Sequence, residues 1–139
     1  MENYIEAKST IYKLQQPDDT LILNADDPTL KQLTTQTANM APQIKWFGTN
    51  AMADASLNNG TLCIHQEKLM EQKELKLRGD FNALNVLAAG LAAQSAGATL
   101  NQISSAAKQF NGVEHRLEYL GVYGGLACYN DSISVSYTH

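Results

Sequence analysis

Apolar and polar positions in the first third of the chain follow the pattern of an α/β protein. Near the amino end, apolar residues recur every three or four positions, which predicts a helix that stops near Pro17. Residues 20–23 form a short apolar run between polar residues, which predicts a buried strand of a parallel sheet. Asp27 and Pro28 then form the N-cap and first position of a helix that runs to about Thr37. The apolar face of the first helix is made of Tyr4, Ala7, Ile11 and Leu14.

Three more extended segments are predicted in the middle of the chain. Residues 43–48 contain bulky apolar side chains and predict another strand. Within residues 54–65, Asn58-Asn59-Gly60 separates two short runs and predicts a hairpin, because Asn and Gly accept a positive φ. The Lys- and Glu-rich residues 67–76 predict an edge strand or an exposed loop whose charges are solvated.

A helical hairpin is predicted next, joined by Gly97-Ala98. Asp80 caps its first, longer helix, and Thr99 caps its second helix, which runs to about Phe110. The apolar stripe of the longer helix is Phe81, Leu84, Ala88 and Leu91. Beyond Gly112 the pattern changes, and two strands at residues 116–123 and 126–129 are predicted around a pair of glycines.

Composition and charge narrow the class of protein. The chain has 139 residues, 44% of them hydrophobic, which suits one domain with a buried core and excludes a disordered chain. Its 10 Lys and Arg residues against 14 Asp and Glu residues give a net charge of −4. This balance argues against a nucleic acid or a membrane surface as partner, and it leaves room for a local phosphate or nucleotide pocket.

Three features predict a cytoplasmic protein. Cys63 and Cys128 lie far apart, without the spacing of a disulfide framework or a zinc site. Residues 81–107 carry no charge, but Asn, Gln, Ser and Gly interrupt them, so they do not predict a membrane span. Met1 is followed by polar residues, which predicts no secretory signal.

Lys8 lies within the predicted apolar face of the first helix, where a charged residue is unusual. One interpretation is that its methylene groups cover the core while its ammonium reaches water. The other is that the side chain is desolvated and offers a neutral amine for covalent chemistry.

Two groups of polar side chains are candidates for ligand binding. Asn24, Asp26 and Asp27 follow the first strand, at the end where α/β sheets place ligands, although turn and cap roles explain them as well. Asn82 and Asn85 lie three apart in the first turns of the long helix, where they either read the edge of a base or serve the helix start.

A third group lies near the predicted final strands. Arg116 can grip a phosphate or ribose through its planar fork, and Asp131 can accept hydrogen bonds from two ribose hydroxyls. The alternative is a surface pair of Arg116 with Glu118 and an Asx turn at Asp131. The chain has no G-x-x-x-x-G-K-[ST] motif, so it does not form a complete P-loop ATPase.

Five short motifs follow one another along almost the whole chain. They are Tyr4-x-x-Ala7-Lys8-x-x-Ile11-Tyr12, Asn24-Ala25-Asp26-Asp27, Arg78-Gly79-Asp80-Phe81-Asn82-Ala83-x-Asn85-x-x-Ala88-Ala89, Phe110-x-Gly112-Val113-Glu114-His115-Arg116-Leu117-Glu118 and Asn130-Asp131-Ser132. In this order they resemble the Mur ligase family. The resemblance implies an α/β fold: residues 1–111 correspond to the second half of the P-loop-type ATPase central domain, without its phosphate loop. Residues 112–139 correspond to the first β-hairpin of a Rossmann-like C-terminal domain.

The resemblance also implies roles for four residues. Lys8 matches the lysine that the family carbamylates, which gives magnesium the hard oxygen ligands it prefers. Asn82 matches the residue that reads the adenine of ATP, and Arg116 and Asp131 match residues that hold the nucleotide. Because the family's other magnesium ligands have no counterpart here, Lys8 is expected to be unmodified in this chain.

Among members of the family, the motifs are most similar to the cytoplasmic ligase that adds D-glutamate to UDP-N-acetylmuramoyl-L-alanine in peptidoglycan precursor synthesis. That reaction forms an amide through an acyl phosphate, with ATP and magnesium, and the chain is expected to be inactive alone. Two alternatives remain: another Mur or folylpolyglutamate synthase-type ligase, and a non-catalytic α/β binding module. The unpaired edges of the last hairpin also predict self-association.

Overall fold

The computed structural model describes residues 2–36, 42–114 and 118–131, and it contains a mixed five-stranded sheet. Its strands, in spatial order, are β1 (Thr20–Asn24), β2 (Gln43–Gly48), β3 (Ala55–Asn58), β4 (Thr61–Ile64) and β5 (Glu67–Glu71). The pairs β1–β2 and β2–β3 are parallel, whereas β3, β4 and β5 form an antiparallel meander. The predicted α/β class is therefore confirmed, with a parallel half that leads into an antiparallel half.

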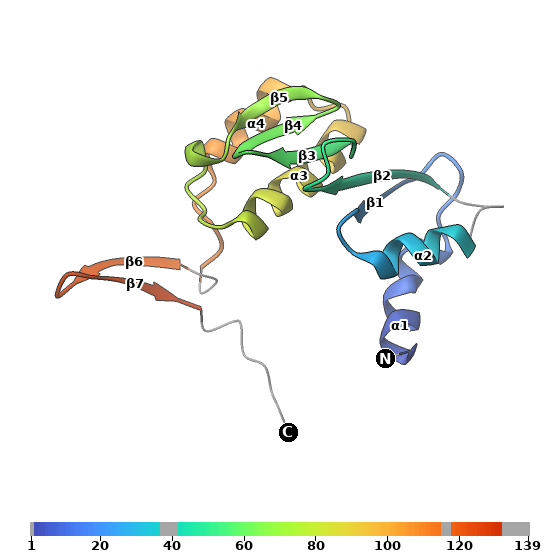
Figure 1. Ribbon diagram of the computed structural model, residues 1–139, viewed down its shortest axis with the longest axis horizontal. Helices are drawn as coiled ribbons and strands as arrows, with labels where there is room; N and C mark the ends of the chain where they lie inside the picture. The colour runs from blue at the N-terminus through green and yellow to red at the C-terminus, as the bar shows by residue number, and fades with distance from the viewer. Residues whose placement is uncertain (1, 37–41, 115–117, 132–139) are drawn as a thin grey trace.

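Two helices cover one face of this sheet, α3 (Asp80–Ser95) and α4 (Leu100–Gln109) (Figure 1). The main core lies between α3 and the strands, and α4 packs beside α3 and against β5. The largest fully buried side chains are Leu62, Ile64, Met70, Leu87 and Leu91. The predicted cap of α4 is confirmed, because the Thr99 side chain accepts a hydrogen bond from the Gln102 backbone. In return, the Gln102 side chain accepts a hydrogen bond from the Thr99 backbone.

Helix α3 begins where predicted, but its predicted cap is wrong and its predicted apolar stripe is right only in part. Gly79, not Asp80, is the N-cap, and Asp80 instead accepts a hydrogen bond of 2.8 Å from Gln72 Nε2. Phe81, assigned to the apolar stripe, is 50% exposed, whereas Leu84 packs against the core and Leu91 is fully buried. An Ala-rich helix is apolar on most sides, so its periodicity does not define one face. The residues of α3 that are buried are Ala83, Leu87, Gly90 and Leu91.

Helix α1 (Glu2–Lys13) forms as predicted, but the carboxyl-terminal end of its apolar face is not covered. Ile11 is 76% exposed and Leu14, just beyond the helix, is 87% exposed. Lys8 is also exposed, so neither contact with a core nor desolvation describes it in this chain. The helical period was therefore predicted correctly, but none of the described elements covers Ile11 and Leu14.

The remaining elements of the first half agree with the sequence. In α2 (Pro28–Gln36), Asp27 Oδ1 accepts a hydrogen bond of 2.8 Å from the Thr29 backbone, which confirms the predicted cap. Asn59 and Gly60 form the β3–β4 turn, both with positive φ. Strand β5 lies at the edge of the sheet and leads into the short 3₁₀ helix η1 (Gln72–Glu74).

The last described elements form a two-stranded hairpin of β6 (Glu118–Tyr123) and β7 (Leu126–Asn130). Figure 1 shows this hairpin, in orange and red, projecting away from the five-stranded sheet. Strand β6 ends at Tyr123 as predicted, and its predicted first residues, 116 and 117, lie outside the described residues. Strand β7 begins at Leu126 as predicted and extends one residue further than predicted, to Asn130. Among the described helices, none combines the length and the hydropathy needed to cross a bilayer. The hairpin's place at the start of a further domain stays a prediction.

Candidate functional site

A groove of about 1040 Å³ lies where α3, α4, the segment after α4 and the β6–β7 hairpin meet. Its floor is made of small and apolar side chains from the facing sides of the two helices. These are Val86, Ala89, Gly90 and Ala93 of α3 and Ile103, Ala106 and Ala107 of α4. A volume of this size holds a ligand as large as a nucleoside.

Two amide side chains from the start of α3 line this groove, those of Asn82 and Asn85. Their spacing of three residues places them on neighbouring turns of one helix face. Asn82 Nδ2 donates a hydrogen bond of 2.8 Å to the Arg78 carbonyl oxygen, which fixes the orientation of that amide. The exposed Asn85 lies further along the same groove. Together they bring both donors and acceptors to a largely apolar surface.

The backbone at the start of α3 requires glycine at position 79. Gly79 has a φ of 92°, and a Cβ atom there would lie 2.7 Å from Cε1 of Phe81. The Phe81 ring therefore lies directly against Gly79, at the rim of the groove. Any larger residue would both strain the backbone and displace this ring.

Lys76 joins two walls of the groove. Its Nζ donates hydrogen bonds of 2.8 Å to Asn111 Oδ1 and 3.4 Å to the Gln109 carbonyl oxygen. The same two segments also touch at Gly112, where a Cβ atom would lie 3.0 Å from Cδ2 of Leu77. The segment before α3 and the segment after α4 are thus held together by one ammonium group and one close contact.

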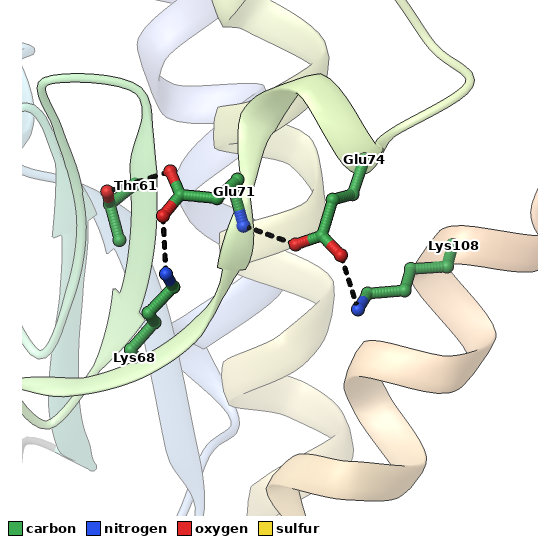
Figure 2. A network of polar contacts seen from close by, with 5 residues as sticks. All are labelled: Thr61, Lys68, Glu71, Glu74 and Lys108. Atoms are coloured by element: carbon green, nitrogen blue, oxygen red, sulfur yellow. Dashed lines mark hydrogen bonds and ion pairs between the residues drawn. The ribbon is translucent and has the colours of Figure 1, made fainter.

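A network of charged side chains supports the same region from β5 (Figure 2). Lys68 pairs with Glu71, which also accepts a hydrogen bond of 3.1 Å from Thr61 Oγ1. Glu74 bridges onward, because it accepts a 2.8 Å hydrogen bond from the Glu71 backbone and lies 2.7 Å from Lys108 Nζ on α4. The network therefore connects β4, β5, η1 and α4 in one chain of contacts.

These contacts shift the ionisation of three of its members. The hydrogen bond from Lys68, followed by that from Thr61, holds the pKa of Glu71 below its ordinary value. The hydrogen bond from Lys108, followed by that from the Glu71 backbone, lowers the pKa of Glu74. The hydrogen bond to Glu71 raises the pKa of Lys68. Each charged form is therefore favoured in the folded protein.

The hairpin adds an aromatic wall that the sequence analysis missed. Tyr119 and Tyr129 both line the groove and lie opposite each other across β6 and β7, with ring centroids 5.3 Å apart. A regular hairpin closed by Gly124 and Gly125 would place Leu120 opposite Tyr129. An irregularity in the pairing between Tyr119 and Gly121 shifts the register by one residue. The pattern of aromatic residues was visible in the sequence, but this shift was not.

The four predicted site residues have four different outcomes. Asn82 lines the groove. Asp131 is exposed and directly follows the last residue of β7, two positions after Tyr129, but it is not among the residues that line the groove. Lys8 lies on α1 and is not part of the groove lining. The role assigned to Arg116 falls outside the described residues.

As predicted, the carboxyl end of β1 carries Asn24, Asp26 and Asp27, but their side chains accept hydrogen bonds from backbone amides. Asn24 Oδ1 accepts a hydrogen bond of 2.9 Å from the Asp26 backbone, which forms an Asx turn. The Asp26 carboxylate accepts hydrogen bonds from the Thr49 backbone at 2.9 Å and the Thr49 hydroxyl at 3.1 Å. With the Asp27 cap, these contacts favour the structural interpretation of all three residues.

A nucleotide-sized groove on an α/β domain fits the comparison with known protein families. The sequence model of the Mur ligase middle domain matches residues 1–93. The chain therefore belongs to the Mur ligase family.

Curated relatives are similar over nearly the whole chain. The chain is 37% identical over 139 residues to the UDP-N-acetylmuramoylalanine--D-glutamate ligase of Acidobacterium capsulatum, covering 94% of this chain and 30% of that protein. It is 39% identical over 132 residues to the protein of the same name from Shouchella clausii, covering 94% of this chain and 29% of the relative. The chain thus spans about 30% of the length of these relatives.

A solved structure supports the fold. The structure is similar to a crystal structure of MurF from Acinetobacter baumannii, with a TM-score of 0.75 over 94% of this chain and 29% of that chain. Sequence identity there is 20%, so the likeness concerns the fold alone.

Proposed function

We propose that this chain is the second half of the central ATP-binding domain, followed by the start of the C-terminal domain, of a ligase that joins D-glutamate to UDP-N-acetylmuramoyl-L-alanine. The observation that carries the proposal is the identity of 36–39% to relatives of that name over nearly the whole chain. We place the domain boundary after residue 111, in the segment between the end of α4 at Gln109 and the start of β6 at Glu118. A cytoplasmic location is part of this proposal.

The groove fits the adenosine end of ATP. Its floor offers an apolar surface for a flat base, and Asn82 and Asn85 offer amide groups at the edge of that base. Asp131 would accept hydrogen bonds from the ribose hydroxyls, and Arg116 would hold the nucleotide by its guanidinium fork. When bound in the longer protein, ATP supplies the phosphoryl group that activates the substrate carboxylate.

Magnesium is a different case, because the described residues alone do not fit it. No group of three or more His, Cys, Asp or Glu side chains within the described ranges could hold a metal ion. Lys8 as an amine offers no oxygen ligand. We therefore assign this chain a single contribution, a carbamate on Lys8 that would become an oxygen ligand in the longer protein, and we derive no step through the ion.

The groove positions the nucleotide, and this is the chemical work proposed for these residues. The Asn82 amide and the wall fixed by Lys76 are ordered before the ligand arrives, so these groups need little further ordering on binding. Parts of the longer protein that this chain does not span would hold the substrate carboxylate, the amine and the phosphates. The chain alone is accordingly proposed to bind adenine nucleotides weakly and to form no amide.

Two other enzymes of this fold are alternatives to the proposed ligase. The fold likeness to MurF leaves open a ligase that adds a different amino acid or a folylpolyglutamate synthase-type enzyme. An activity assay of a longer protein that contains this chain and matches the full length of the relatives distinguishes these enzymes. Amide formation with D-glutamate supports the proposal, and a preference for another amino acid contradicts it.

A calorimetric titration with ADP tests the nucleotide site against a non-catalytic module. Asn82→Ala should weaken ADP binding, while Asn101→Ala, an exposed asparagine in the first turn of α4, should bind like the wild type. Equal heats for the wild type and Asn82→Ala would contradict the site. The predicted self-association through the hairpin edges is tested separately, by size-exclusion chromatography over a range of concentrations, and a strict monomer would contradict it.

A further inference from the structure

The tyrosine pair of the hairpin lines the groove and has no part in the roles proposed so far. Tyr119 and Tyr129 are 55% and 40% exposed, so each ring keeps a large part of its surface available to a ligand. Their rings are tilted by 52°, so the two do not stack flat on each other. A cross-strand aromatic pair stabilises a hairpin, but that role does not require it to line a groove.

The surroundings of the pair point to a flat, edge-polar ligand. Asn82 and Asn85 line the same groove and offer the hydrogen-bonding groups that read a base edge. The remaining lining is largely small and apolar, which gives a flat base room to lie between α3 and the hairpin. Aromatic side chains bind bases by stacking without demanding one particular base, because every base has a π-face.

We propose that Tyr119 and Tyr129 form an aromatic platform against which the base of a purine nucleotide stacks. This inference rests on the proposed function and adds binding residues to it. The platform belongs to the hairpin, whereas the amides belong to α3, so a bound base would join the two units. The hairpin is therefore a part of the nucleotide site in its own right.

The position of the platform also bears on Asp131. Tyr129 is two residues before Asp131, so a base that stacks on Tyr129 would bring its ribose toward the end of β7. Stacking thus places the sugar near the carboxylate proposed to hold its hydroxyls. The same strand would hold the base by one residue and the ribose by another.

The test compares ring-keeping and ring-removing variants in ADP titrations followed by NMR. Tyr119→Phe and Tyr129→Phe keep the aromatic face, whereas Tyr119→Leu and Tyr129→Leu keep an apolar side chain of similar reach without it. Tyr123→Leu is the matched control, because Tyr123 is 64% exposed on the same hairpin and is not among the groove-lining residues. Backbone amide signals of β6 and β7 report whether each variant keeps the hairpin.

The platform predicts that each leucine variant at 119 or 129 weakens ADP binding by about tenfold, while the phenylalanine variants and Tyr123→Leu bind like the wild type. It also predicts upfield ring-current shifts of the adenine H2 and H8 protons in the wild type and phenylalanine variants, reduced in the leucine variants. Wild-type affinity and unchanged adenine shifts in leucine variants with an intact hairpin would overturn the platform alone. Absence of ADP binding by the wild type would overturn the proposed function together with it.

Discussion

Lys76 Nζ lies 2.8 Å from Asn111 Oδ1, and this hydrogen bond joins residues that are 35 positions apart in the sequence. It connects the segment that leads into α3 with the segment that follows α4, and both segments line the groove. The width of the proposed nucleotide site is therefore set by a contact between its two walls, in addition to the packing of the helices on the sheet.

Replacing Lys76 should loosen this site. Lys76→Met removes both hydrogen bonds, and we expect ADP affinity to fall by about two- to tenfold, the equivalent of one or two net hydrogen bonds. Lys76→Arg keeps a donor and should restore most of the affinity. The measurement is calorimetry with ADP, and Lys73→Met on η1, also exposed, serves as the control. If Lys76→Met binds ADP as tightly as Lys73→Met does, the contact has no part in shaping the groove.

The ion-pair network predicts a pH dependence of stability. The pKa of Glu74 is lowered from its ordinary value of 4.5, so the unfolded state binds the proton more readily. Its contribution to stability is then complete above about pH 4.5 and is lost as the pH falls through the lower folded-state pKa.

Urea unfolding from pH 3 to pH 7 measures this contribution. Glu74→Gln should be less stable than the wild type at pH 7, and the difference should shrink as the pH falls from 4.5 through the lower folded-state pKa of Glu74. Glu67→Gln, at the exposed start of β5, should show a smaller effect. A difference between the wild type and Glu74→Gln that stays constant across this range would show that the carboxylate's charge does not matter.

The core between α3 and the sheet predicts a large difference between two leucines. Leu87 is fully buried in this core, so Leu87→Ala should lower the free energy of unfolding by about 2–5 kcal/mol. Leu14 is 87% exposed, and Leu14→Ala should change it by about 0.5 kcal/mol or less. Chemical denaturation of the two variants measures both values. Losses of similar size at the two positions would contradict the described difference in burial between Leu87 and Leu14.

Lys8 should remain an amine in this chain. A carbamate on lysine is reversible and persists when a metal or a hydrogen-bonded site holds it. The Lys8 side chain is exposed, and the described residues hold no metal-binding group of His, Cys, Asp or Glu. The ¹³C NMR spectrum of the chain in ¹³C-labelled bicarbonate should show no carbamate signal that disappears in Lys8→Arg. Such a signal would contradict this expectation.

Local chemistry made much of the fold predictable. Strand β2 has the predicted bounds because a bulky apolar segment ends at a glycine. The starts of α2 and α4 follow from side chains that cap the helix backbone directly. Each of these features depends on residues within a few positions of each other. Sequence patterns record such short-range rules well.

The errors came from long-range packing. The buried face of α3 is set by Gly90, where a Cβ atom would lie 2.9 Å from Ile64 Cδ1 and 3.3 Å from Ile103 Cγ2, so this side of the helix approaches both β4 and α4 closely. No local period encodes that approach. The tyrosine platform was missed for a related reason, because one shift in the pairing of β6 and β7 decides which residue faces Tyr129.

The central claim is that Asn82, Arg116 and Asp131 contact one nucleotide, and an NMR titration of the isotope-labelled chain with ADP tests it most directly. The account predicts that the Asn82 side-chain amide, the Arg116 guanidinium and the Asp131 backbone amide shift together along one saturation curve, while the Asn24 amide stays in place. Two results would contradict the account: saturable shifts at Asn82 without shifts at Arg116 and Asp131, or no saturable shift at any of the three residues.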